Sequence, residues 1–168
     1  MLHFDLNNST SNTLLIAGSG RSGTTWLSEI INYRNEYRDI FEPFHPKVNN
    51  KINFEHKFIA EHNNSENIYK NVQKILQGKI RNYWTDKFNK KLIINKRLIK
   101  CIRANLFLKY VHRNFIEIPI IFIIRNPFAV VNSKMRLNKE KGWHFPQYFD
   151  EMIKNEDFYQ MNFCALYN

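Results

Sequence analysis

The sequence contains little cysteine, glycine or proline and no long apolar segment. Its 168 residues include two cysteines, five glycines and five prolines. Cys101 and Cys164 lie far apart and lack metal-ligand spacing, so we expect two free thiols in a reducing compartment rather than a disulfide framework or a zinc site. The longest apolar run, residues 120–124, is too short to cross a bilayer. Residues 1–5 do not resemble the start of a signal peptide, so the sequence predicts a cytoplasmic protein.

Negative charge is also scarce. There are 15 acidic residues against 25 Lys and Arg, which gives a net charge of +10 at pH 7. Such a field favours anionic partners, among them nucleotides, sulfated or phosphorylated glycans, nucleic acid and acidic lipid. Charge alone does not choose among them, and a solvated basic surface explains it equally well. An apolar content of 43% nevertheless predicts one folded domain with a real core rather than disorder.

Three of the five glycines fall within residues 18–23, directly after an apolar run. The pattern predicts a strand at residues 14–17, a glycine loop, and a helix over residues 23–33 with an apolar face. Glycines let the backbone turn tightly and point N–H groups at an anion, and the helix start adds the positive end of its dipole. The spacing of Gly18, Gly23 and Thr25 is that of a phosphate-binding P-loop.

The lysine of a nucleotide kinase is missing from this loop. Thr24 stands in its place, and the cation lies inside the loop as Arg21. Thr24 and Thr25 can donate hydroxyl hydrogen bonds, while the guanidinium of Arg21 offers a planar fork to phosphate oxygens. We therefore expect a site for an activated sulfate or phosphate group and not for ATP hydrolysis.

The rest of the chain alternates between strand and helix patterns. We expect further strands at residues 39–41, 92–94 and 120–124, and a loop over residues 44–64. Expected helices are a long one capped by Ser65 and running through Trp84, one around residues 102–111, one that begins at Pro127, and one over residues 146–165. This alternation predicts a three-layer α/β/α fold around a parallel sheet.

Polar residues follow three of the expected strands. The glycine loop, Glu42 and Arg125 each come directly after a strand, so they should meet at the carboxyl edge of the sheet, where ligands bind in such folds. Glu42 as a solvated turn residue before Pro43, and Arg125 as a strand-ending charge, are the simpler alternatives.

Two of these segments resemble the PAPS-dependent sulfotransferases, where PAPS is 3′-phosphoadenosine-5′-phosphosulfate. Residues 18–26 resemble the 5′-phosphosulfate loop of that family, and residues 27–31 and 39–45, with the pair Glu42-Pro43, resemble its carbohydrate branch. Residues 121–135 resemble the 3′-phosphate motif, in which an arginine ends a strand and a serine follows eight residues later. Asn126 departs from this motif, since relatives usually carry aspartate. Residues 100–103 resemble an upstream basic stretch less closely.

The resemblance covers residues 13–42 and 92–136 and implies a P-loop NTPase-like fold that moves a sulfuryl group from PAPS to an acceptor hydroxyl or amine on a carbohydrate. The product is adenosine 3′,5′-bisphosphate, and no metal ion is required. The implied donor site comprises Gly20, Arg21, Ser22, Gly23, Thr24, Thr25 and Trp26 for the phosphosulfate, and Arg125 and Ser133 for the 3′-phosphate.

The resemblance also implies catalytic roles. Arg21 would stabilise developing charge and Glu42 would be the general base, with His45 as the competing base. It further implies a single domain over residues 1–168 without the C-terminal strand and loop that help relatives to hold the adenosine.

Three alternatives remain open at this point. A P-loop kinase or NTPase would need a lysine at Thr24 and a magnesium-binding aspartate after the apolar strand, where Arg125 and Asn126 stand. A non-enzymatic domain that binds nucleic acid or another polyanion would use the many basic residues of the segment 79–113, but leaves the order of the two motifs unexplained. The third is a sulfotransferase-like chain too incomplete to turn over.

Overall fold

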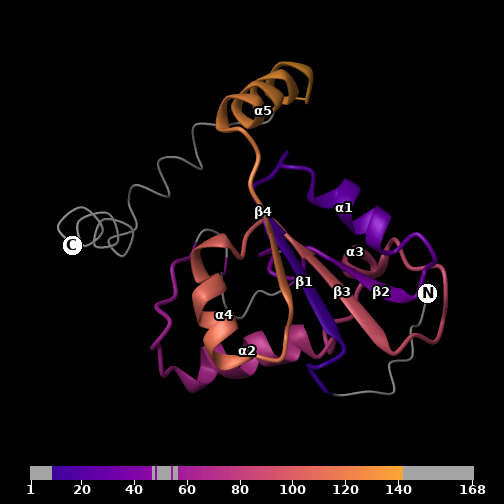
Figure 1. Cartoon of the computed structure of the whole chain (residues 1–168), viewed down its shortest axis with the longest axis vertical. Coiled ribbons are helices and arrows are strands. Elements are labelled where there is room, and N and C mark those ends of the chain that lie inside the picture. The colour runs from indigo at the N-terminus through magenta and orange to yellow at the C-terminus, as the bar shows by residue number, and fades with distance from the viewer. Residues whose placement is uncertain (1–8, 47, 49–53, 55–56, 142–168) are drawn as a thin grey trace.

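Four parallel strands form a sheet in the order β2-β3-β1-β4 (Figure 1). The computed structural model describes residues 9–46, 48, 54 and 57–141. The strands are β1 (Thr13–Gly18), β2 (Tyr37–Phe41), β3 (Lys96–Cys101) and β4 (Ile120–Ile123). The helices are α1 (Thr24–Ile31), α2 (Glu66–Leu76), α3 (Tyr83–Asp86), α4 (Leu108–Asn114) and α5 (Pro127–Lys141), with a 3₁₀ turn η1 (Asn105–Phe107). This arrangement confirms the expected α/β fold with a parallel sheet flanked by helices.

The main core lies on the face of the sheet that α2, η1 and α4 cover. It is formed by buried apolar side chains from these elements and from three strands, among them Leu15, Ile40, Val72, Ile99, Phe107 and Val111. Cys101 is a buried free thiol in this core, whereas Cys164 lies outside the described residues. The opposite face is covered by α1. Asp39, Phe41 and Lys100 face α1, because the side chains of a strand alternate between the two faces of a sheet.

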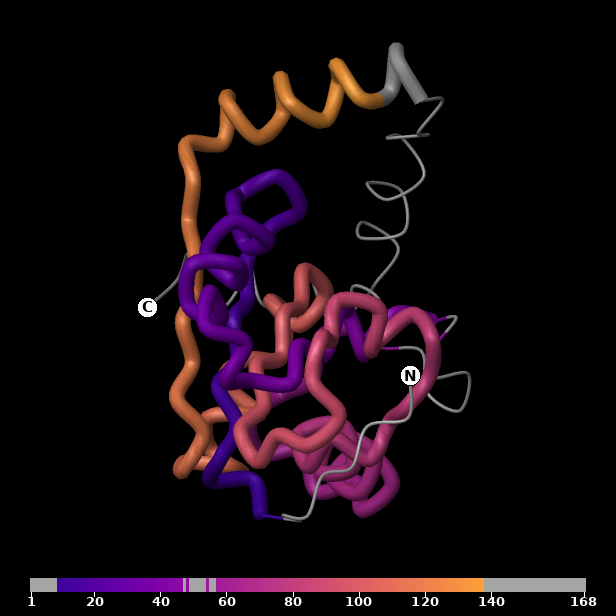
Figure 2. The backbone as a smooth tube through the Cα atoms, turned by 90° about the vertical axis from the view of Figure 1, so that its right-hand side faces the viewer, coloured from indigo at the N-terminus to yellow at the C-terminus, as the bar shows by residue number. Residues whose placement is uncertain are grey.

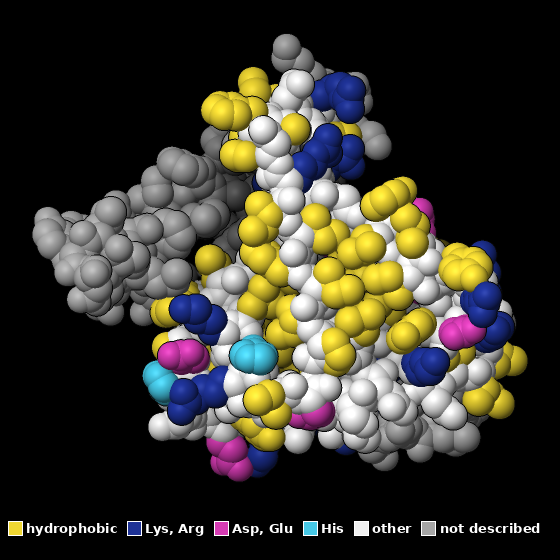
Figure 3. All heavy atoms as spheres, in the orientation of Figure 1, with side chains coloured by type: hydrophobic (Ala, Val, Ile, Leu, Met, Phe, Trp, Pro, Cys, Tyr) yellow, Lys and Arg dark blue, Asp and Glu magenta, His cyan; other side chains and the backbone are white. Residues whose placement is uncertain are grey.

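The expected apolar face of α1 is not the face that packs on the sheet. Trp26 is 67% exposed and Ile30 is 47% exposed, while the helix buries Thr24 and Ser28 instead. Phe122 of β4 and Ile124, which follows this strand, are exposed as well. Figure 3 shows apolar side chains gathered over β4 and α1 on one face of the molecule.

The helix that follows Ser65 is shorter than its sequence pattern predicted. The Oγ of Ser65 accepts a hydrogen bond from the N–H of Ile68 and caps α2 as expected. The helix ends at Leu76, because Gly78 adopts a left-handed conformation with φ 67°. The N–H groups of Gly78 and Lys79 return to the carbonyls of Ile75 and Lys74, which is the Schellman arrangement that ends helices. Tyr83 and Trp84 consequently belong to a separate helix, α3.

The third strand was expected at residues 92–94, and this prediction was wrong. The strand is β3, which begins at Lys96 and lies between β2 and β1. Its charged residues are paired, which allows a basic segment to occupy the middle of the sheet: the Nε of Arg97 donates to the Oγ1 of Thr13 at 2.9 Å, and Lys100 binds Glu42.

The remaining elements largely follow the sequence patterns. The strands β1, β2 and β4 and the helix α5, which begins at Pro127, lie where they were expected. The helix expected over residues 102–111 is displaced, since η1 and α4 occupy residues 105–114. The described part of the 44–64 loop contains no helix or strand. The helix expected over residues 146–165 lies outside the described residues.

Candidate functional site

The glycine loop, residues 19–23, joins β1 to α1 and is closed by its own hydrogen bonds. The N–H and the Oγ of Ser22 both donate to the carbonyl of Ser19, the latter at 2.6 Å. A Cβ on Gly18 would lie 2.8 Å from Ser22 Oγ and 2.9 Å from the carbonyl oxygen of Ile123, so a larger residue does not fit there. Gly23, with φ 103°, occupies the left-handed region that favours glycine. The structure therefore requires two of the glycines that the sequence pattern singled out.

The loop leads into a helix N-terminus that can receive an anion. Within the described residues no side chain caps α1, and its first turn contains no acidic residue. Free N–H groups and the positive end of the helix dipole therefore point at the loop. Thr25 is exposed at this end, whereas Thr24 is only 3% exposed and Ser22 is 7% exposed. Of the hydroxyl groups expected to reach a ligand, that of Thr25 is the most accessible.

The two sequence motifs meet in space. The Nε of Arg21 donates to the Oγ of Ser133 at 3.0 Å, and the Nη1 of Arg125 donates to the carbonyl oxygen of Arg21 at 3.0 Å. Figure 2 shows α5 crossing the end of the molecule above the loop. The expected 5′-phosphosulfate and 3′-phosphate residues therefore form one continuous basic site, although more than 100 positions separate them in the sequence.

The departure at Asn126 has a structural explanation. Its Oδ1 accepts hydrogen bonds from the N–H groups of Phe128 and Ala129, at 2.9 and 3.2 Å, at the start of α5. Asparagine and aspartate are about equally good at this capping position. The exchange of Asp for Asn therefore preserves the link between Arg125 and its helix.

One cation of the site was not singled out in the sequence. Lys134 follows Ser133 on α5, and its Cε lies 4.0 Å from the position that a Cβ on Gly20 would occupy. Partial burial lowers the pKa of Lys134. Because it lies one position beyond the motif serine, its contact with the loop depends on the angle at which α5 leaves the sheet, which the sequence does not give.

Glu42 is a buried charge and not a solvated turn residue. It is 2% exposed, and its backbone adopts φ 48°. Its Oε1 accepts from the Nζ of Lys100 at 2.8 Å, and its Oε2 accepts from the N–H of Ile102 at 3.1 Å and the Nη1 of Arg103 at 3.2 Å. The basic stretch 100–103, which resembled the family only weakly, thus holds the candidate base. The two cations were visible in the sequence, but neither the strand whose end they flank nor their target was.

An aromatic cluster lies next to Glu42. The rings of Trp84 and Phe88 pack edge-on against Phe41, and the Nζ of Lys87 lies 3.8 Å from the Phe41 centroid. The Nζ of Lys100 is 4.2 Å from the same centroid, so two ammonium groups contact this ring. Burial, followed by the charge of Lys100, lowers the pKa of Lys87. The ring of His45, the competing candidate base, lies against Trp84 at 5.5 Å.

No helix in the described part of the chain is long and apolar enough to cross a membrane.

Comparison with known proteins gives one match. Searches of curated proteins and of solved structures found no significant match. A family model, the sulfotransferase domain, matches residues 11–165, which include the four strands of the described sheet and both motifs of the basic site. The chain therefore belongs to the sulfotransferase domain family, whose members are PAPS-dependent transferases of the sulfuryl group.

Proposed function

We propose that this protein transfers the sulfuryl group of PAPS to a hydroxyl group of a carbohydrate, with the donor held by the basic site of Arg21, Arg125 and Ser133. The observation that carries the proposal is the pair of hydrogen bonds that joins the glycine loop to the arginine–serine motif. One nucleoside that carries phosphate at its 5′ and 3′ positions supplies an anion to each part.

The reaction requires little covalent chemistry from the protein. The acceptor oxygen forms a bond to sulfur, the bond from sulfur to the bridging oxygen breaks, and that electron pair remains on the 5′-phosphate of the product. The acceptor loses its proton to a base. As in phosphoryl transfer, catalysis then depends on positioning and on stabilising charge. The loop N–H groups, the start of α1 and Arg21 are proposed to stabilise the charge on the bridging oxygen, and the uncapped start of α1 supports this role.

The 3′-phosphate is proposed to bind Arg125 and Ser133. The guanidinium of Arg125 supplies permanent charge, and the hydroxyl of Ser133 supplies a hydrogen bond. Lys134 adds a third cation to the site, after Arg21 and Arg125.

Glu42 is proposed as the base. Lys100 and Arg103 hold its carboxylate, so they determine where the acceptor hydroxyl can reach it. Both oxygens of Glu42 accept hydrogen bonds in this structure. Because a carboxylate oxygen has two lone pairs, the acceptor hydroxyl would donate to Oε1 beside the Nζ of Lys100 when Glu42 takes its proton. Glu42→Gln should lower kcat by about 10²–10⁴-fold with little change in donor binding. If His45→Ala causes this loss and Glu42→Gln does not, His45 is the base instead.

The donor site can be tested by calorimetry with adenosine 3′,5′-bisphosphate. Arg21→Ala and Arg125→Ala should each weaken binding about tenfold or more, since each removes a charged hydrogen bond worth ~1.5–3 kcal/mol. Arg113→Ala is the matched control, because Arg113 is exposed on α4. Failure of the native chain to bind, or equal binding by all variants, would refute the site. Tighter binding of magnesium ATP would favour the kinase alternative.

A further inference from the structure

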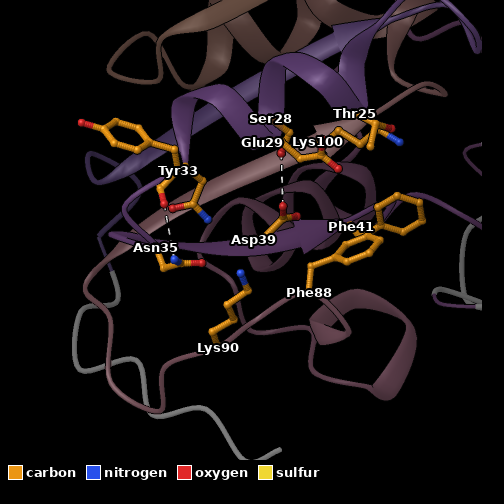
Figure 4. Close-up of a pocket in the computed structure, with 11 residues that line it drawn as sticks. Thr25, Ser28, Glu29, Tyr33, Asn35, Asp39, Phe41, Phe88, Lys90 and Lys100 are labelled. Carbon is orange, nitrogen blue, oxygen red and sulfur yellow. Dashed lines mark hydrogen bonds between the residues drawn. The ribbon is translucent and has the colours of Figure 1, made fainter.

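A cavity of about 290 Å³ lies between α1 and β2 (Figure 4). The helix contributes Thr25, Ser28 and Glu29 to its wall, and the strand contributes Asp39 and Phe41. It is slightly smaller than the pockets of ~300–1,000 Å³ in which drug-sized molecules bind, so it suits a single ring of a larger ligand.

One end of this cavity adjoins the proposed transfer site. Thr25 is the exposed hydroxyl residue at the start of α1, next to the glycine loop. Lys100 also lines the cavity, and its Nζ is bound to the Oε1 of Glu42. A ligand in the cavity would therefore have one end beside the donor loop and beside the lysine that binds the candidate base, which is where an acceptor must be placed.

Asp39 gives the cavity an unsatisfied hydrogen-bond acceptor. Its Oδ2 accepts from the Oγ of Ser28 at 3.1 Å, whereas its Oδ1 is buried and has no hydrogen-bond partner among the described residues. A buried carboxylate oxygen without a donor is costly and rare. Burial raises the pKa of Asp39 to about 6, because the carboxylate loses contact with water. A ligand hydroxyl would supply the missing donor.

The charges of the cavity favour a neutral ligand. The carboxylates of Glu29 and Asp39 are matched by the ammonium groups of Lys90 and Lys100, unlike the basic donor site around Arg125. A second anion near the buried carboxylate of Asp39 would be repelled. The half-buried ring of Phe41 and the ring of Phe88, which is 49% exposed, add apolar surface of the kind that packs against a sugar ring.

We infer that this cavity binds a neutral saccharide unit of the acceptor and that Asp39 accepts a hydrogen bond from one of its hydroxyl groups. The role of this saccharide as the acceptor rests on the proposed function, whereas its binding site rests on the cavity itself. Thr25 and Lys100 mark the end of the cavity at which the reacting hydroxyl leaves it toward the donor.

The test is titration of the full chain with the methyl β-glycosides of glucose, galactose and N-acetylglucosamine, followed by NMR, with and without adenosine 3′,5′-bisphosphate. Asp39→Asn and Phe88→Ala should each weaken glycoside binding about tenfold. Glu61→Gln and Ile116→Ala are the matched controls, since both side chains are exposed and neither lines the cavity. All four variants should bind the bisphosphate like the native chain.

The outcomes separate this inference from the proposed function. Absence of glycoside binding by the native chain, or binding that Asp39→Asn and Phe88→Ala leave unchanged, would overturn the saccharide site. Tighter binding of methyl glucuronide, an anion, or of p-nitrophenol would overturn the neutral saccharide class. If the bisphosphate does not bind but the glycoside pattern holds, the saccharide site stands and the proposed transfer fails. Asp39→Asn keeps the size of the side chain, so a folded variant is expected.

Discussion

Replacing Asp39 by asparagine should stabilise the protein at neutral and alkaline pH. Asp39 lies on β2 under α1, and burial is the largest influence on its carboxyl group. The hydrogen bond from Ser28 and the charge of Lys100 favour the ionised form but do not compensate for burial, so its pKa rises from 3.8 to about 6. Asparagine has the same shape and no charge, and its amide oxygen can still accept from Ser28.

The sign and size of the effect follow from this pKa. A raised carboxyl pKa means that the folded state binds the proton more tightly than the unfolded chain, so stability falls as pH rises from about 4 to above 6. Because one pKa unit corresponds to about 1.36 kcal/mol, ionised Asp39 costs about 3 kcal/mol above this window. Asp39→Asn should recover about this amount at pH 8 and almost nothing at pH 4. That gain is a large part of the ~5–15 kcal/mol by which domains are stable.

Urea denaturation at intervals from pH 4 to pH 8 measures this difference directly. The free energy of unfolding of Asp39→Asn should exceed that of the native chain by an amount that grows with pH and levels off above about pH 7. Glu61→Gln, at an exposed site, should show no such trend. A difference that does not depend on pH, or a variant less stable than the native chain at pH 8, would refute the reasoning.

Three further predictions concern the loop, the buried base and the end of α2. Gly18→Ala should destabilise the chain by about 1–3 kcal/mol and abolish bisphosphate binding in calorimetry, because its Cβ would meet the carbonyl oxygen of Ile123 at 2.9 Å; unchanged binding would contradict the tight fit. Lys100→Met should destabilise by about 3 kcal/mol in urea, since Glu42 loses one of its two cations, and Lys100→Arg should restore part of this. Gly78→Ala should lower stability by about 1 kcal/mol through its left-handed backbone, without changing donor affinity.

The sequence predicted those parts of the fold whose pattern is local. The strand before the glycine loop and the apolar strand β4 are short apolar runs with clear ends, and Ser65 and Pro127 mark two helix starts. The strand β3 was missed because Lys96, Arg97 and Lys100 hide its period. Their burial depends on partners such as Thr13 and Glu42, which come from other elements and cannot be inferred from neighbours in the chain.

In the site, too, the residues of local motifs were predicted from the sequence, whereas contacts between distant segments were not. The order of the two motifs pointed to Arg21, Arg125 and Ser133, and the structure brings them together. The sequence did not reveal that Glu42 is enclosed by two cations, nor that Asp39 faces a cavity under α1. Both facts depend on which residues of neighbouring strands stand side by side, and the misplaced third strand made that comparison impossible.

The hydrogen bond between Arg21 and Ser133 has a consequence for affinity. The bond uses only the Nε–H of Arg21 and a lone pair of Ser133, so the Nη groups of Arg21 and the O–H of Ser133 can each donate to a separate phosphate, and the first phosphate to bind orders both side chains for the second. The two phosphates should therefore bind with positive coupling, so that the affinity for the bisphosphate exceeds what 3′-AMP and 5′-AMP predict together. In Ser133→Ala this coupling should disappear. The bond between Arg21 and Ser133 would then favour the doubly phosphorylated nucleotide over the monophosphates.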